Sequence, residues 1–163
     1  MTHDIMVEPL TAEAFSEFGD VIEAVGPATR IINGGRCERF SDLARLDFGD
    51  TGRPAISVFS SAPVTLPLVV TMLERHPEGS QAFIPMSADP FLVVVAPDED
   101  GVPGRPRAFV TAPGQGVNYL RDGWHGVLSP LVRPALFAVV DRIGPGLDVE
   151  EHHFATPYRV VEG

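Results

Sequence analysis

A carboxylate, two imidazoles and a carboxamide stand out in this sequence as groups able to bind a small molecule or a metal ion. Glu74 and His76 lie one residue apart at the end of an apolar run that begins at Leu68. Alternate side chains of an extended strand share a face, so both groups share one with the apolar residues of even number before them. We therefore expect Glu74 and His76 to project into a barrel interior.

The residues that follow predict a tight turn and a returning strand. Pro77, Glu78 and Gly79 have turn chemistry, and the apolar stretch 81–86 opens with Gln81. A hairpin of this kind returns Gln81 toward the same pocket. Polar groups that converge in an apolar container are the usual construction of a small-molecule site.

A second polar and aromatic cluster occupies residues 115–125, QGVNYLRDGWH, and ends at His125. In a cupin barrel, two histidines one residue apart, an acidic residue a few positions later and a histidine from a later strand bind a metal ion. Glu74, His76, Gln81 and His125 follow that order, so the pattern resembles a cupin site with two ligands replaced. Glu74, His76 and His125 are candidate ligands of a divalent ion, and Gln81 is a weak fourth ligand or a hydrogen-bond donor to substrate.

A structural interpretation of the same residues stays open. Glu74 can be a strand-end carboxylate paired with Arg75 or Arg39, and His76 can pack beside Pro77. The adjacent pair His152 and His153 is predicted to lie in an exposed, non-functional tail after Gly144. Neighbouring side chains on an extended segment point to opposite sides, so one metal ion would not easily be held by both. Residues 97–106 are predicted to form a solvated hairpin connection.

Composition predicts one all-β domain over residues 1–163. Sixteen prolines and sixteen glycines, spread along the chain, divide it into short segments. One short N-terminal helix is expected, with Thr11 as its cap, Phe15 and Phe18 on one face and Gly19 at its end. The expected strands cover residues 20–23, 29–32, 36–40, 55–60, 66–76, 81–86, 91–96, 107–111, 116–120 and 136–142.

Charge and composition exclude several functions. A formal charge of −10 argues against nucleic acid or an anionic membrane as a partner. All twelve basic residues are arginine, which rules out a lysine Schiff base and a P-loop. With Cys37 as the single cysteine, no intrachain disulfide forms, and we expect Cys37 to be structural. No transmembrane run or signal peptide is visible, so a cytoplasmic location is expected.

Several segments, in order, resemble the ureidoglycolate lyases of purine and allantoin degradation. They are AFSEFGDVIE, INGG, ERFSDLA, LERHPEGSQAFIPM, FLVVVA and QGVNYLRDGWH with the following Gly126, and they extend from Ala14 to about Arg142. The sequence departs from the family pattern at Gly34, where an asparagine is expected, and at Gly126, where a second histidine is often found. The resemblance implies a cupin-like double-stranded β-helix, a homodimer, nickel or another divalent ion, and cleavage of (S)-ureidoglycolate to glyoxylate and urea.

Residue roles follow from that reaction, which requires a base, an acid and charge stabilisation. His76 or His125 is expected to transfer the proton, with Glu74 orienting a histidine or binding metal. Substrate-binding candidates are Arg39 and Arg121 for the carboxylate, Gln81 and Asn118 for the urea group, and Tyr119 nearby. Two alternatives are a ureidoglycolate hydrolase that releases ammonia and carbon dioxide, and a non-catalytic cupin-like binding module; a cupin-like sugar isomerase or epimerase is a further one.

Overall fold

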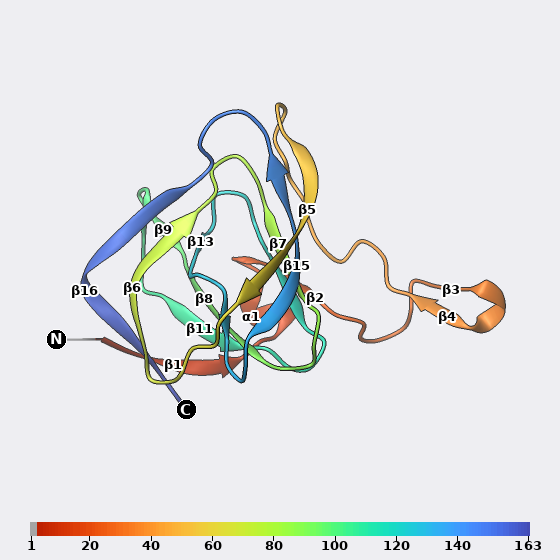
Figure 1. The fold of residues 1–163 in the computed structure, drawn as a ribbon, viewed down its shortest axis with the longest axis horizontal. Coiled ribbons are helices and arrows are strands. Elements are labelled where there is room, and N and C mark those ends of the chain that lie inside the picture. Colours follow the sequence, from red (N-terminus) through yellow and green to blue (C-terminus); the bar gives the residue numbers. More distant parts are fainter. Residues whose placement is uncertain (1–2) are drawn as a thin grey trace.

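The computed structural model describes residues 3–163 and shows an almost entirely β-stranded barrel with one short α-helix (Figure 1). The elements are β1 (His3–Pro9), α1 (Ala12–Phe15), β2 (Gly19–Ile22), β3 (Arg30–Ile32), the 3-10 turn η1 (Asn33–Gly35), β4 (Cys37–Arg39), β5 (Arg53–Ser61), β6 (Leu68–Arg75), β7 (Gln81–Pro85), β8 (Phe91–Ala96), β9 (Asp98–Glu99), β10 (Val102–Pro103), β11 (Arg107–Val110), β12 (Gly116–Tyr119), β13 (Trp124–His125), β14 (Ser129–Pro130), β15 (Ala135–Ile143) and β16 (Glu150–Val161).

Two sheets build the barrel. The larger has the order β11-β1-β16-β6-β13-β8-β14, and an additional β11–β8 pairing closes it. The smaller has the order β2-β12-β7-β15-β5, so β5 is an edge strand. The predicted cupin-like all-β fold with one short N-terminal helix is confirmed.

The apolar core explains why β8 reads as the uninterrupted run FLVVVA. Its odd-numbered residues, such as Val93, join the cluster inside the barrel, whereas its even-numbered residues, such as Val94, join a second cluster on the other face. A strand buried on both faces has no polar side to alternate with. This strand pairs with β11, β13 and β14 in the larger sheet, and its pairing with β13 positions His125.

The N-terminal helix forms as its cap predicts. The Thr11 side chain accepts a hydrogen bond from the Ala14 backbone N–H at 3.1 Å, and Phe15 and Phe18 enter the barrel core. The expected role of Gly19 as helix terminator is wrong, because the helix ends at Phe15 and Gly19 begins β2. A Cβ at Gly19 would lie 1.8 Å from the Asn118 carbonyl oxygen, so glycine is needed for the close approach of β2 to β12.

The prediction of a loop-like tail after Gly144 is wrong. Residues 150–161 form β16, which pairs in parallel with β1 and antiparallel with β6. Val160 is the one fully buried residue of β16, so the strand lacks the apolar alternation that sequence reasoning uses. Backbone hydrogen bonds to β1 and β6 hold this strand in place instead. The predicted hairpin at residues 97–106 is present as β9 and β10.

A hairpin projects from the barrel, and we call it the arm (residues 30–39, comprising β3, η1 and β4). It is the orange extension in Figure 1, and within residues 3–163 its strands pair only with each other. Its turn uses positive φ angles at Asn33, Gly34 and Gly35, which a glycine pair accommodates. None of the helices in the described part of the chain is long and apolar enough to cross a membrane.

Candidate active site

Glu74, His76 and His125 meet at one end of the barrel. Glu74 is near the end of β6, His76 follows that strand, and His125 on β13 lies directly opposite Glu74 in the ladder. One ligand atom from each of the three lies within 4.8 Å of the others. His76 Nε2 and Glu74 Oε1 are 4.0 Å apart. The three groups that the sequence singled out thus converge.

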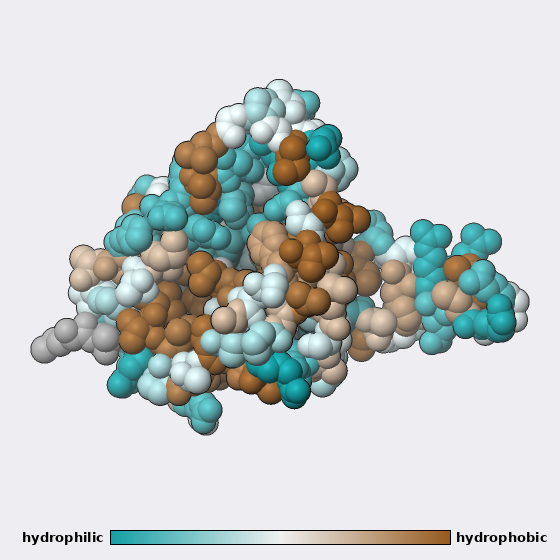
Figure 2. Space-filling view, viewed as in Figure 1, coloured by the Kyte–Doolittle hydropathy of each residue, from teal (hydrophilic) through white to brown (hydrophobic). Residues whose placement is uncertain are grey.

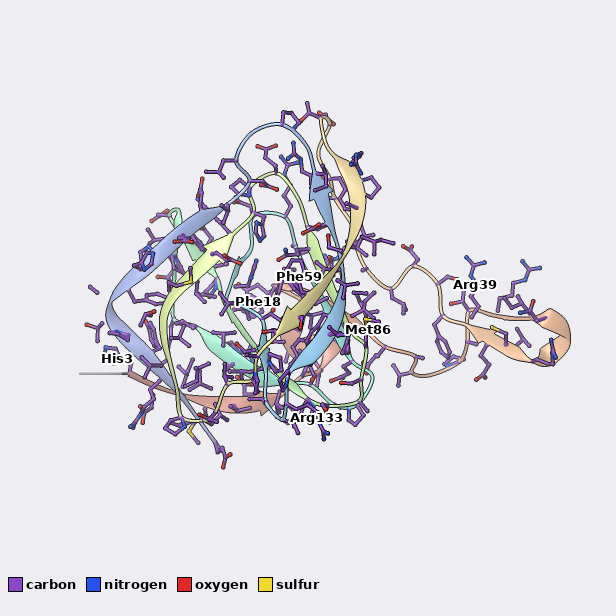
Figure 3. All side chains as sticks on the ribbon, viewed as in Figure 1. His3, Phe18, Arg39, Phe59, Met86 and Arg133 are labelled. Carbon is purple, nitrogen blue, oxygen red and sulfur yellow. The ribbon has the colours of Figure 1, made fainter. Side chains whose placement is uncertain are left out.

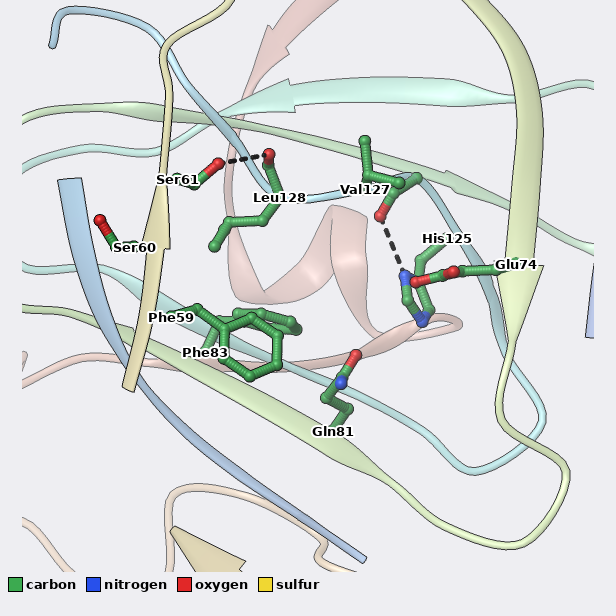
Figure 4. A pocket seen from close by; sticks show the side chains of 10 residues that line it. Phe59, Ser60, Ser61, Glu74, Gln81, Phe83, His125, Val127 and Leu128 are labelled. Atoms are coloured by element: carbon green, nitrogen blue, oxygen red, sulfur yellow. Dashed lines mark hydrogen bonds between the residues drawn. The ribbon is translucent and has the colours of Figure 1, made fainter. Parts of the chain in front are cut away.

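Backbone carbonyls fix the orientation of both imidazoles. His76 Nδ1 lies 2.7 Å from the Asp148 carbonyl oxygen, and His125 Nδ1 lies 3.0 Å from that of Gly126 (Figure 4). A carbonyl oxygen can only accept, so each Nδ1 carries a proton and donates it. Both Nε2 atoms are then left with a lone pair, and both are buried without a hydrogen-bond partner in the described chain. Two free imidazole lone pairs beside a carboxylate form a ready set of ligands.

Gln81 adds an oxygen to this group. Its Nε2 donates to Asp141 Oδ2 at 3.2 Å, while its Oε1 is buried and has no hydrogen-bond partner within residues 3–163. Figure 4 shows Gln81 rising from β7 toward Glu74 and His125. Asp141 therefore turns the carboxamide so that its oxygen is free for a ligand.

Burial decides the charge states. It lowers the pKa of His125 to about 3, and the neighbouring His76 lowers this pKa further, although the Gly126 carbonyl opposes the shift. Tyr119 stacks on His125 with ring centroids 4.2 Å apart and an interplanar angle of 4°, so one face of the imidazole is covered. His125 is consequently neutral near pH 7, as a metal ligand or hydrogen-bond acceptor must be.

Glu74 is shifted in the opposite direction. Burial raises the pKa of its carboxyl group, His76 partly offsets this, and the negative charge of Glu151 adds to it. Burial and the charge of Glu74 also raise the pKa of the Tyr119 hydroxyl, which therefore stays protonated. A carboxylate with a raised pKa is a better proton acceptor than an ordinary one.

Glu74, Gln81 and His125 open onto a cavity of about 490 Å³, which suits a small molecule, whereas His76 and Tyr119 lie behind its lining. The lining residues are Phe59, Ser60, Ser61, Glu74, Gln81, Phe83, His125, Gly126, Val127 and Leu128 (Figure 4). Polar groups lie at the end near β6, and the phenyl rings of Phe59 and Phe83 form an apolar wall. No arginine is among the described residues that line this cavity.

The other predicted site residues lie outside the cavity. The Asn118 side chain donates to Asp20 Oδ2 at 3.0 Å and to the Arg45 carbonyl at 3.1 Å. Arg121 donates to the Pro77 carbonyl at 2.7 Å and so holds the turn after His76. Both residues therefore hold neighbouring segments in place by hydrogen bonds and do not line the cavity.

Arg39 is the most distant predicted site residue. It lies on the arm, outside the barrel that contains Phe59 (Figure 3). An ion pair between Arg39 and Glu74 was one structural interpretation of the sequence, but Glu74 lies in the candidate site inside the barrel. Arg75, the other alternative, pairs with Glu150 at 2.7 Å and with Asp98 at 3.1 Å and lies 4.5 Å above the Trp124 ring.

Sequence reasoning missed several residues that shape the site. Asp148 acts through its backbone carbonyl, which every residue type possesses, so no sequence signal identifies it. Asp141 was not recognised because only the pairing of β15 with β7 brings it to Gln81. Phe59, Ser60 and Ser61 come from an edge strand whose two faces are both partly exposed, which hides its inner side.

Comparison with known proteins places this site in a family. The family model described as ureidoglycolate lyase matches residues 2–161. The chain belongs to the ureidoglycolate lyase family. It is 58% identical over 159 residues to "Ureidoglycolate lyase" of Rhodobacter capsulatus, with 98% of both chains covered. It is also 54% identical over 157 residues to a protein of that name in Mesorhizobium japonicum, with 96% of each chain covered.

The donor set fits the divalent ion that this family resemblance implied. Two imidazoles whose Nε2 atoms have no hydrogen-bond partner in the described chain and one carboxylate suit a transition-metal ion, and the Gln81 oxygen is a weaker fourth donor. These residues are the ones that would hold such an ion in a ureidoglycolate lyase site of this form.

Proposed function

We propose that this protein is a carbon–nitrogen lyase that cleaves (S)-ureidoglycolate into glyoxylate and urea. Family membership over nearly the whole chain carries the proposal. The cavity supports it, because a carboxylate with a raised pKa and the His125 imidazole face a space of suitable size, and His76 lies within 4.8 Å of both. The same cavity offers neither a lysine nor a cysteine nucleophile, and this reaction requires neither.

The reaction needs one proton to move between two atoms of the substrate. The hydroxyl group loses its proton, its electron pair forms the carbonyl of glyoxylate, the C–N bond breaks, and the urea nitrogen takes up a proton. We assign the proton transfer to Glu74 with His76 beside it, since Glu74 has the raised pKa and the two groups are 4.0 Å apart. A single protein group can act as both base and acid, because the proton that it takes from the substrate hydroxyl is the one that it gives to the urea nitrogen.

His125 has a different role from a proton donor. An imidazole with a pKa of about 3 is not protonated near neutrality, so we assign His125 to binding through its neutral Nε2. Glu74, His76 and His125 would hold a divalent ion, with nickel as the ion expected from family resemblance, and the Glu74 carboxylate has a second oxygen that could still accept the proton. Such an ion, when bound, supplies positive charge that lowers the pKa of the substrate hydroxyl.

The remaining substrate contacts follow from the cavity lining. We propose that the Gln81 oxygen and the hydroxyl group of Ser61 receive the urea group, and that Tyr119 positions His125 by stacking. Asn118 and Arg121, which hydrogen-bond outside the cavity, are assigned to support.

Separate assays of urea, ammonia and glyoxylate after incubation with (S)-ureidoglycolate test this proposal. The lyase forms urea and glyoxylate in equal amounts without ammonia. Ammonia in place of urea would identify the alternative ureidoglycolate hydrolase, and binding without any product would identify a binding module.

We further propose a single domain over residues 1–163 that works in the cytoplasm as a homodimer. The two clusters of the core draw on strands from β1 to β16, which supports one folding unit. Exposed apolar side chains on the outer face of β5 support self-association.

A further inference from the structure

The cavity lacks an arginine to receive the substrate carboxylate, although the chain contains twelve arginines. Six of these form ion pairs with carboxylates of the barrel: Arg45, Arg75, Arg107, Arg121, Arg133 and Arg159. Arg53, Arg105 and Arg142 are also outside this group, but the side chain of each donates a hydrogen bond to an oxygen elsewhere in the chain. Within residues 3–163, the guanidinium groups of the arm make neither kind of contact: Arg30, Arg36 and Arg39. The arm is therefore the place where guanidinium groups remain available.

The ladder of the arm sets two of these guanidinium groups side by side. Arg30 and Arg39 are direct partners in the antiparallel pairing of β3 with β4. Side chains of such a pair lie on the same face, and like charges directly opposite each other are unfavourable. Both residues are exposed, and within residues 3–163 neither has an ion-pair partner. An anion between them would remove the repulsion.

Charge and shape indicate which molecule the arm contacts. The arm carries three arginines and one glutamate, whereas the whole chain has a net charge of −10. A two-stranded hairpin is at best marginally stable alone, and Ile31 of this one is 63% exposed. The acidic barrel of a second copy offers both opposite charge and a surface to cover it.

The barrel has a face on which a second copy fits. On the outer side of β5, Ile56 is 79% exposed and Val58 is 61% exposed, and the neighbouring Leu136 of β15 is 47% exposed. Figure 2 shows apolar surface over β5 and β15 and a largely hydrophilic arm. Since β5 is a nine-residue edge strand, an uncovered apolar face there would favour aggregation.

The same strand borders the cavity. Phe59, Ser60 and Ser61 of β5 line it, so a copy packed on the outer face of β5 lies beside the cavity mouth. A twofold symmetric contact is reciprocal, so if one arm reaches the other barrel, both arms do. We propose that the paired Arg30 and Arg39 of one subunit complete the active site of the other by binding the substrate carboxylate. This inference rests on the proposed lyase function.

Complementation between two defective variants tests the inference. The first variant, His125→Ala, has a defective pocket and an intact arm; the second, Arg30→Gln with Arg39→Gln, has an intact pocket and a defective arm. In a mixed dimer, the intact pocket faces the intact arm. Co-expressed subunits should therefore regain about a quarter of wild-type activity below KM, since about half of randomly formed dimers are mixed and each has one competent site.

The controls separate the inference from the function on which it rests. Arg36→Gln removes one charge from the arm outside the pair and should leave kcat/KM near the wild-type value. Arg30→Gln with Arg39→Gln should raise KM roughly tenfold or more, the scale of a lost charged hydrogen bond. Glu74→Gln replaces His125→Ala if the latter does not fold.

Three results would overturn the inference while wild-type enzyme still forms urea and glyoxylate. They are a mixed population no more active than its parents, an unchanged KM in the double arm variant, and monomeric wild-type enzyme in light scattering. Wild-type enzyme that forms no urea would instead contradict the proposed function itself.

Discussion

The polar groups of the barrel cavity and those of the arm are held in opposite ways. At the site, hydrogen bonds to backbone carbonyls orient His76 and His125, and a hydrogen bond to Asp141 orients Gln81. Each of these buried side chains therefore has one defined orientation. On the arm, Arg30 and Arg39 are exposed and held only by a short ladder. The difference indicates that the closed barrel preorganises the pocket, whereas the charges of the arm would be positioned by the second subunit of the proposed dimer.

The strongest test of the preorganised cavity is His125→Ala. Loss of this imidazole should lower kcat roughly 10²-fold, the upper end of the losses seen when the ligand arrangement of a metal site is disturbed. His153→Ala, at a side chain that is 68% exposed on β16, is the matched control and should have little effect. Melting temperature is measured for both. A folded His125→Ala enzyme with near-native kcat would remove His125 from the site.

Removal of divalent ions is expected to have an effect of similar size. Chelator-treated protein should lose most of its activity and regain it with nickel or another divalent ion. Binding is measured independently of activity, by visible absorption of added Co²⁺ or Ni²⁺, and His76→Ala should abolish that signal. Full activity of protein verified as metal-free would show that side chains alone carry the reaction.

Replacement of the arm tests whether it is separable from the barrel. A short glycine-serine linker in place of residues 30–39 should leave the circular dichroism of the barrel almost unchanged, because the arm strands pair only with each other. Activity should fall roughly tenfold or more through loss of the carboxylate contact. If the barrel unfolds instead, the two regions are not independent.

A smaller effect is expected where the cavity is only adjusted. Asp141→Ala frees the Gln81 carboxamide to rotate, so kcat/KM should fall severalfold, about the energy of one hydrogen bond. Asp141→Asn keeps an acceptor oxygen for the Gln81 N–H and should restore much of the activity. Equal losses in the two variants would indicate a role for the charge of Asp141 and not for its hydrogen bond.

The smallest effect concerns the support behind the site. Burial raises the pKa of Asp20, but hydrogen bonds from the Arg45 backbone and Asn118 outweigh it, so this pKa is lowered in the folded protein. The stabilisation is present above the unfolded pKa of about 3.9 and is lost as pH falls through the lower folded value. Asp20→Asn should lower the melting temperature by roughly 2–4 °C at pH 7 and by less at pH 3. An identical shift at both pH values would contradict this assignment.

Much of the fold was predictable because its signals are local. Thr11 caps the helix, the apolar run of β8 identifies a strand buried on both faces, and Gly34-Gly35 marks the turn of the arm. β16 was missed because only one of its residues is buried. A strand that is held chiefly by backbone hydrogen bonds to its neighbours shows no alternation of apolar residues in the sequence.

For the site, the sequence determined which groups are present, and the tertiary structure decided which of them face the cavity. The spacing of Glu74 and His76 is a local property of the sequence. Both residues form the candidate metal-ligand cluster with His125. Asn118 and Arg121 are close in sequence to His125, yet pairing of β12 with β2 turns the Asn118 side chain toward Asp20, away from the cavity. Burial and proton positions arise only when distant strands close around a side chain. The free Nε2 lone pair of His125 is therefore a product of the barrel, because the surrounding packing and the Gly126 carbonyl create it.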